Sequence, residues 1–279
     1  MTYCIGILVR EGLVMMADTR TNAGVDNIST YRKLRILDSG PDRVIVSCSA
    51  GSLSVTQSAL SRVELGIVMP DSGETETPAT APTVFRAAQI VGQALSQAKA
   101  SVDLVVKDDK VQTDASLLLA GSIDGRKPRL FLIYGAGNFI ECQVDTPFLQ
   151  IGELKYGKPV LDRMINYETP MAEAIKVALI SFSSTMRSNL AVGLPIDLIT
   201  VRSGVSKLEL VYRIEADDTY YHEINDRWSN ALRAAAAAIP LPQYASAPDG
   251  AGVTDKCQPA ATALPRHPSP PPVSAAATA

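Results

Sequence analysis

The chain opens with two short apolar segments that are separated by a tight polar turn. Residues 3–9 and 13–17 are apolar runs with β-branched side chains, and Arg10-Glu11-Gly12 lies between them. Short apolar runs joined by a glycine-containing turn are typical of a β-hairpin. The hairpin places Asp18 at the end of the return strand, near the level of the chain start.

Further along the chain, helical periodicity appears in two pairs of segments. Apolar residues recur at helical spacing in residues 51–65, 84–102, 155–166 and 171–186, and a last helix is predicted through residues 228–237. We expect Thr83 to cap the second helix and Thr169 to cap the fourth, which would have Pro170 at its first position.

The other predicted strands stand between these helix pairs. They cover residues 31–37, 43–49, 116–123, 129–134, 139–144, 197–202 and 208–214. Helices grouped in pairs, and not alternating with single strands, argue against a doubly wound parallel sheet. Two antiparallel sheets packed face to face, with a helix pair outside each, would bury all the apolar faces. The pattern therefore predicts an α+β fold, a four-layer α-β-β-α sandwich.

The composition changes sharply near residue 238. Residues 239–279 are dense in Pro, Ala and Ser, and they hold few large apolar side chains to offset the entropy of ordering. We expect a folded domain over residues 2–237 and a disordered tail over residues 238–279. A second polar stretch, residues 69–82, is interpreted as an exposed loop because predicted helices flank it.

The charge balance excludes some classes of partner. The 279 residues hold 26 Lys and Arg against 29 Asp and Glu, which gives a net charge of -3. A mildly acidic chain of this kind lacks the electrostatic footprint of a general nucleic-acid binder. No uncharged apolar run approaches the roughly 20 residues of a membrane span, and the start has no signal-peptide pattern. We expect neither nucleic acid nor a membrane as partner.

The cysteine pattern gives no sign of a metal site. Cys4, Cys48, Cys142 and Cys257 form no Cys-x-x-Cys spacing, and the chain has two histidines. This argues against a zinc site or a disulfide scaffold and fits the reducing cytoplasm. Cys4 and Cys48 are interpreted as small buried apolar residues. We expect no metal and no cofactor.

One set of residues near the chain start has the chemistry of a nucleophilic site. Thr2 follows Met1, and a small second residue permits removal of the methionine, which would leave Thr2 with a free α-amino group. A threonine hydroxyl needs a base to act as a nucleophile. An α-amino group titrates at about pH 7.7–8.0, so Thr2 would carry nucleophile and base together.

Four other residues fit this set. Lys33 would lower the pKa of the Thr2 hydroxyl and amine, and Asp18 would keep Lys33 charged and oriented. Arg20 would balance and position the Asp18 carboxylate. Gly51, where a predicted strand passes into a helix, would direct its N–H at a developing oxyanion.

These residues resemble a proteasome-type β-subunit, and within that family the bacterial branch called Anbu. The resemblance covers residues 2–237. It rests on Ala17-Asp18-Thr19-Arg20, Lys33-Leu34 and Ala50-Gly51, and on the segments 151–159 and 186–197. It implies an N-terminal nucleophile hydrolase with Thr2 as nucleophile, Asp18 and Lys33 as catalytic partners, Gly51 as oxyanion donor, and assembly into a homo-oligomeric ring.

The chain departs from the proteasome pattern at three positions. Glu153 stands where the family has a serine after glycine, and Asn189 and Val192 stand where it has aspartate and serine. Glu153 would add a second carboxylate near the amine and raise its pKa. Asn189 would lack the charge of the aspartate. The support of Thr2 is therefore expected to differ from that of a conventional peptidase.

Three functions remain open from the sequence. The leading hypothesis is a threonine-type peptidase or amide hydrolase that acts through an acyl-enzyme. The second is a ring-forming scaffold whose nucleophile has lost its support, as the changes at Glu153, Asn189 and Val192 would allow. The third is an amide-forming or acyl-transfer enzyme on the same site. The substrate would be a peptide or amide, and the participation of an unfoldase or adaptor stays open.

Overall fold

The computed structural model describes residues 1–22, 28–106 and 111–242. The chain consists of two units, Met1–Ala231 and Leu232–Ala279. The residues predicted to carry chemistry all belong to the first unit. Most of the predicted tail lies outside the described residues, and the boundary near residue 238 stays a prediction.

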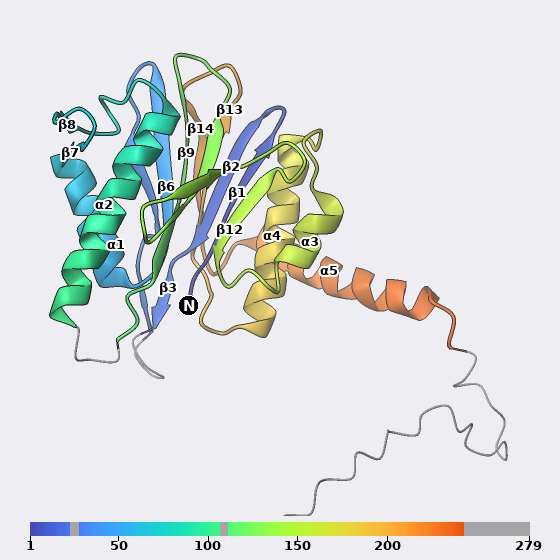
Figure 1. Ribbon diagram of the computed structural model, residues 1–279. Coiled ribbons are helices and arrows are strands. Elements are labelled where there is room, and N and C mark those ends of the chain that lie inside the picture. The colour runs from blue at the N-terminus through green and yellow to red at the C-terminus, as the bar shows by residue number, and fades with distance from the viewer. Residues whose placement is uncertain (23–27, 107–110, 243–279) are drawn as a thin grey trace, which may run out of the picture. The chain divides into compact units, whose positions relative to one another are not determined.

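The described part of the first unit contains two five-stranded sheets in which all neighbouring strands are antiparallel (Figure 1). The first sheet has the order β12 (Phe148–Gly152), β1 (Tyr3–Val9), β2 (Gly12–Asp18), β13 (Ile196–Arg202) and β14 (Leu208–Ile214). The second has the order β11 (Phe139–Glu141), β10 (Arg129–Tyr134), β9 (Ala115–Ile123), β6 (Arg43–Gly51) and β5 (Leu34–Asp38).

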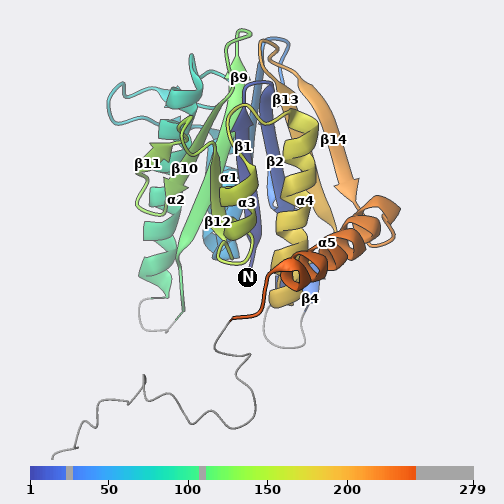
Figure 2. The same cartoon turned by 90° about the vertical axis from the view of Figure 1, so that its right-hand side faces the viewer.

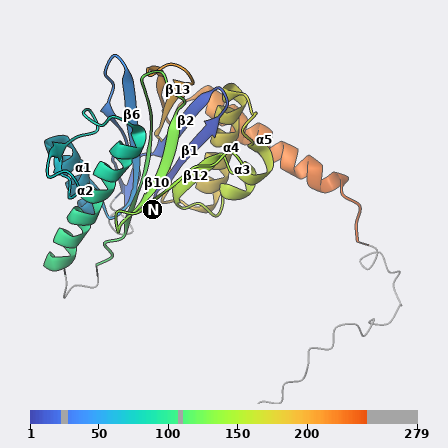
Figure 3. The same cartoon turned by 45° about the horizontal axis from the view of Figure 1, so that its top comes forward.

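Helix pairs cover the outer faces of the two sheets. Helices α1 (Leu53–Leu65) and α2 (Val84–Val105) lie on the second sheet, and α3 (Lys158–Met164) and α4 (Met171–Ser188) lie on the first (Figures 1 and 3). Figure 2 shows α3 and α4 side by side across the face of β1 and β2. Helix α5 (Thr219–Ala238) follows β14. The predicted α-β-β-α sandwich is confirmed.

Strand β2 shows why the fold needs three apolar layers. Successive side chains of a strand point to opposite faces. Leu13 and Met15 pack between the two sheets, whereas Val14 and Met16 belong to the cluster that includes Phe182 of α4. A third cluster joins the second sheet to α1 and α2. Strands β1 and β2 are buried on both faces, so they are apolar up to Asp18 and do not alternate.

The structure differs from the predicted elements in several details, among them the short strands β3 (Arg20–Asn22) and β4 (Ile28–Thr30), which were not predicted. Strand β12 was not predicted, and it pairs with β1 along its length. Residues 31–33 precede β5 and are not part of it.

Thr83 caps α2 as predicted, by accepting a hydrogen bond from the Arg86 N–H. Thr169 does not cap α4: its hydroxyl accepts from the Asn166 N–H in a preceding turn, and Pro170 occupies the cap position.

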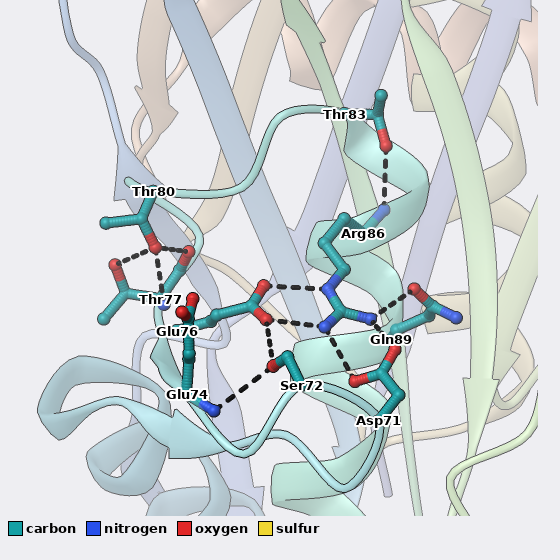
Figure 4. Close-up of polar contacts among 9 residues, drawn as sticks. All are labelled: Asp71, Ser72, Glu74, Glu76, Thr77, Thr80, Thr83, Arg86 and Gln89. Carbon is teal, nitrogen blue, oxygen red and sulfur yellow. Dashed lines mark hydrogen bonds and ion pairs between the residues drawn. The ribbon is translucent and has the colours of Figure 1, made fainter.

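Residues 69–82 were predicted to form an exposed loop, but part of this loop is buried. It contains one strand of a short hairpin, β7 (Ile67–Val68) with β8 (Thr75–Glu76), and Met69 and Ala81 are buried. The Arg86 guanidinium of α2 donates to Asp71 and Glu76 across the loop (Figure 4). These hydrogen bonds lower the pKa of both carboxyl groups. The loop is therefore held against the start of α2.

Arg86→Gln is expected to loosen this loop and leave the rest of the domain folded. Glutamine is neutral and has two N–H donors where arginine has five, so amide hydrogen exchange in residues 69–82 should become several-fold faster. Hydrogen-exchange mass spectrometry measures the effect. Arg62→Gln, which removes an exposed contact of α1 to Ser101, is the matched control. Equal exchange in wild type and R86Q would contradict the assignment.

Candidate active site

A buried ion pair connects the two sheets at one end of the sandwich. Asp18 ends β2 with no exposed surface, and Lys33 precedes β5 and is almost fully buried. Lys33 Nζ donates to Asp18 Oδ1 at 2.7 Å and to the Arg20 carbonyl at 2.6 Å. Burial raises the pKa of the Asp18 carboxyl, and the Lys33 ammonium opposes that rise. The predicted contact between Asp18 and Lys33 is present.

Asp18 also fixes the first strand. The Tyr3 N–H donates to Asp18 Oδ1 at 2.9 Å, and the Gly193 N–H lies 3.5 Å from Oδ2. Because Tyr3 directly follows Thr2, the same carboxylate that holds the Lys33 ammonium also holds the backbone next to Thr2. The position of Thr2 relative to Lys33 is therefore set through one side chain.

Strand β12 holds Thr2 from the opposite side. The Glu153 N–H donates to the Thr2 carbonyl at 2.7 Å, immediately after the pairing of Tyr3 with Gly152. Gly152 has φ of 86°, and a Cβ there would lie 2.0 Å from the Thr2 carbonyl oxygen. This close approach requires glycine.

Thr2, Lys33 and Gly51 line one small cavity of about 30 Å³. The other residues of its wall are Thr21, Tyr31, Ser49, Ala50, Leu53 and Thr56. Gly51 has φ of 98°, and a Cβ there would lie 2.1 Å from the Asp114 carbonyl oxygen, so only glycine fits where β6 ends. A hydroxyl, a buried ammonium and a glycine backbone that share a cavity have the composition that nucleophilic attack on a carbonyl needs.

Two of the three departures from the proteasome pattern contact each other. Asn189, the C-cap residue of α4, donates from Nδ2 to Glu153 Oε2 at 2.9 Å, and Lys155 Nζ lies 3.5 Å from Oε1. Glu153 is 6% exposed. Val192 is buried in the core beside α4. The Glu153 carboxylate is thus bound by an amide and an ammonium, and its backbone N–H contacts Thr2. An effect of Glu153 on the amine stays a prediction.

The expectation that Arg20 pairs with Asp18 is wrong. The Arg20 guanidinium donates to the Leu190 carbonyl at 2.7 Å and lies against Gly193, and no ion pair between Arg20 and Asp18 exists in the described structure. Asp18 already accepts bonds from an ammonium and two backbone N–H groups in a buried position. A second cation there would be desolvated with little further gain. Arg20 reaches the site through its backbone carbonyl, which binds Lys33.

One positioning side chain was missed by the sequence reasoning. The Tyr3 hydroxyl lies 2.5 Å from Ser181 Oγ of α4 and accepts from Gln150 Nε2 of β12 at 2.6 Å. Its ring packs on Phe182, with 4.7 Å between the ring centroids. A tyrosine in a fully apolar strand is the available signal, because a buried tyrosine hydroxyl needs a hydrogen-bond partner.

Tyr3→Phe is expected to lower the free energy of unfolding by about 1–3 kcal/mol. The variant keeps the ring but leaves the buried Ser181 hydroxyl and the partly buried Gln150 amide without their shared partner. Urea denaturation measures the change. Tyr134→Phe, at a 38% exposed position, is the matched control and should be nearly neutral. Equal stability of Y3F and wild type would show that the hydroxyl contacts add nothing.

The described residues include no cluster of three or more His, Cys, Asp or Glu side chains that could hold a metal ion. The thiols of Cys4, Cys48 and Cys142 are buried and unbridged. Cys4 and Cys48 lie in the apolar layer between the sheets, as predicted. No helix within the described ranges is long and apolar enough to cross a membrane.

Comparison with solved structures identifies relatives over most of the chain, whereas no protein-family model and no curated protein sequence matches it. An Anbu mutant from Hyphomicrobium sp. strain MC1 is 43% identical, with a TM-score of 0.77, over 87% of this chain and 99% of its own. Anbu (ancestral beta-subunit) from Yersinia bercovieri is 38% identical, with a TM-score of 0.78, over 86% and 98%.

A third relative is the Anbu protein of Pseudomonas aeruginosa, whose structure is described as a helical assembly. It is 36% identical, with a TM-score of 0.78, over 88% of this chain and 100% of its own. Identity at this level along nearly the whole length of each relative establishes common descent, which the shared fold supports. The chain belongs to the Anbu family, the ancestral β-subunits that are proteasome-type relatives of the N-terminal nucleophile hydrolases.

Proposed function

We propose that the protein is a threonine-type amide hydrolase with Thr2 as its nucleophile after removal of Met1. The observation that carries the proposal is the convergence of Thr2, Lys33 and Gly51 on one cavity, with Lys33 bound to the buried Asp18. Met1 is 65% exposed, so an aminopeptidase can reach it. Its removal gives Thr2 the free amine that serves as base.

In the proposed reaction, Thr2 Oγ1 attacks the carbonyl carbon of a peptide or amide and its proton passes to the Thr2 amine. The Lys33 ammonium favours the ionised hydroxyl electrostatically, and the Gly51 N–H stabilises the oxyanion of the tetrahedral intermediate. The C–N bond then breaks, and the protonated amine returns its proton to the leaving nitrogen. Water attacks the resulting ester and restores the Thr2 hydroxyl.

The test is covalent labelling. The purified full chain is treated with a β-lactone, an electrophile for threonine nucleophiles, and its intact mass is measured. We expect native protein without Met1 and a single adduct, which Thr2→Ala abolishes. Thr21→Ala removes another hydroxyl of the same cavity wall and should keep the adduct.

Three outcomes would overturn the hydrolase proposal. Retention of Met1 in the native protein excludes an amine base, because an acylated nitrogen does not accept the proton. An adduct that persists in T2A places the nucleophile elsewhere. Absence of any adduct on an assembled protein would favour the scaffold hypothesis. If the adduct forms, product analysis with added amines separates hydrolysis from acyl transfer.

We also propose that the chain assembles with copies of itself. The support is the helical assembly described for the Pseudomonas aeruginosa relative, which this chain matches along that relative's entire length. Light scattering after size-exclusion chromatography should give a mass of several subunits. A monomer at micromolar concentration would contradict this part of the proposal.

A further inference from the structure

A second and larger cavity lies at the open side of the sandwich, between β5 and β14. Its volume is about 400 Å³. β5 pairs only with β6, and β14 pairs only with β13, so within the described sheets these two are edge strands on the same side. We call this cavity the edge groove. Its walls are Arg32, Leu34, Arg35, Ile36, Asp197, Leu198, Ile199, Val211, Tyr212 and Arg213.

The edge groove carries an excess of positive charge. Asp197 is its one acidic wall residue, and Arg213 binds it through two hydrogen bonds, at 2.7 and 3.0 Å. Arg32 Nε lies 3.6 Å from the same carboxylate, with its side chain 61% exposed. Arg35 is exposed, and its guanidinium lies over the Tyr31 ring. Two arginines therefore present unused donors to solvent on the β5 wall.

Apolar side chains complete the walls and rim. Leu34 and Ile199 are buried at the base of the groove, whereas Ile36, Val211 and Tyr212 are exposed by 43%, 59% and 49%. Exposed apolar groups beside the unpaired backbone of edge strands are typical of surfaces that accept an extended peptide as an added strand. The chemistry of the groove suits a ligand that is both apolar and anionic.

Acidic groups outside the groove wall lie beside β14, whereas Asp38 at the end of β5 is paired with Arg43. Asp218 accepts a hydrogen bond from the Tyr212 hydroxyl, and the negative charges of Glu215 and Asp217 act on Arg213 and Tyr212 respectively. On the opposite wall, Arg32 shares the Asp197 carboxylate with Arg213, and Arg35 forms no ion pair among the described residues. An acidic side chain of a ligand would therefore face β5 and not β14.

We propose that the edge groove binds an extended peptide segment with alternating acidic and apolar side chains, added to the edge of β5. Lys33 directly precedes β5 and lines the cavity of Thr2. The bound peptide would therefore continue from the edge of β5 toward that cavity. As a statement about substrate class, the inference rests on the proposed function. As a statement about binding, it stands on Arg32, Arg35 and the exposed apolar edge.

The test measures binding without turnover. A fluorescent, end-capped hexapeptide of alternating Glu and Val is titrated with the full T2A chain, and anisotropy is followed. We expect the Glu peptide to bind about tenfold more tightly than the matched Gln peptide and more tightly still than the Lys peptide, with an affinity that falls as salt rises. Equal affinity for the three peptides, or no binding, would overturn the proposal.

Substitutions of the two arginines test whether the peptide binds in the edge groove. Arg32→Gln and Arg35→Gln should each weaken the Glu peptide about fivefold to tenfold and leave the Gln peptide unchanged. Arg35→Glu should reverse the preference toward the Lys peptide. Arg163→Gln, an exposed arginine of α3, is the matched control and should have no effect. Unchanged binding in both R32Q and R35Q would also overturn the proposal.

The inference and the proposed function can fail separately. The β-lactone adduct depends on Thr2 and not on the edge groove, whereas peptide binding is measured in T2A. Labelling without a preference for the Glu peptide would refute the groove and keep the nucleophile. Specific binding without labelling would keep the groove and refute the hydrolase.

Discussion

Lys33→Met is expected to lower the free energy of unfolding by about 3–5 kcal/mol and to abolish the Thr2 adduct. Removal of one partner of a buried ion pair leaves the other as an uncompensated buried charge. Here the remaining group is Asp18, which has no exposed surface. The Arg20 carbonyl also loses its donor. Urea denaturation and intact-mass labelling measure the two effects.

The double variant Asp18→Asn with Lys33→Met separates stability from chemistry. It removes both charges, so much of the lost stability should return, since a neutral buried pair does not require desolvation of an ion. The adduct should remain absent because no cation is left beside the Thr2 hydroxyl. An adduct in either variant at the wild-type rate would show that Lys33 does not activate Thr2.

The layers of the fold could be predicted from the sequence because each layer has its own periodicity. The inner strands are apolar on both faces, and α4 has a regular apolar stripe that packs into the core. Strand β12 was missed for a physical reason. Its five residues include Gln150 and end in glycine, so neither alternation nor a long apolar run marks them. Only pairing with β1 makes this segment a strand.

The Asp18–Lys33 contact could be predicted because the chemistry of a threonine nucleophile and the family resemblance both pair these residues. Asp18 and Lys33 belong to segments of different sheets, so hairpin geometry alone does not bring them together. Contacts that depend on packing between distant elements could not be predicted this way. Glu153 and Asn189 were recognised separately as unusual residues, but their hydrogen bond requires the C-terminus of α4 to reach the end of β12. The position of the Arg20 guanidinium depends on the same packing.

Gly152→Ala is expected to reduce the rate of Thr2 adduct formation about a hundredfold. The added methyl group would lie 2.0 Å from the Thr2 carbonyl oxygen, so the first strand must shift away from β12. A misplacement of about 1 Å near reacting groups can lower a rate by roughly 10²-fold. The variant leaves Asp18, Lys33 and Gly51 unchanged, so labelling kinetics report the position of Thr2.

Gly204→Ala is the matched control for the backbone strain in this experiment. Gly204 has φ of 79°, close to the 86° of Gly152, but a Cβ at Gly204 would meet no atom within 4 Å. Both variants therefore carry the cost of an alanine in the left-handed region, about 1–2 kcal/mol, and only G152A adds the contact with Thr2. G152A should therefore lose more stability than G204A, and only G152A should lose most of its labelling. Equal labelling in the two variants would mean that β12 does not set the position of the nucleophile.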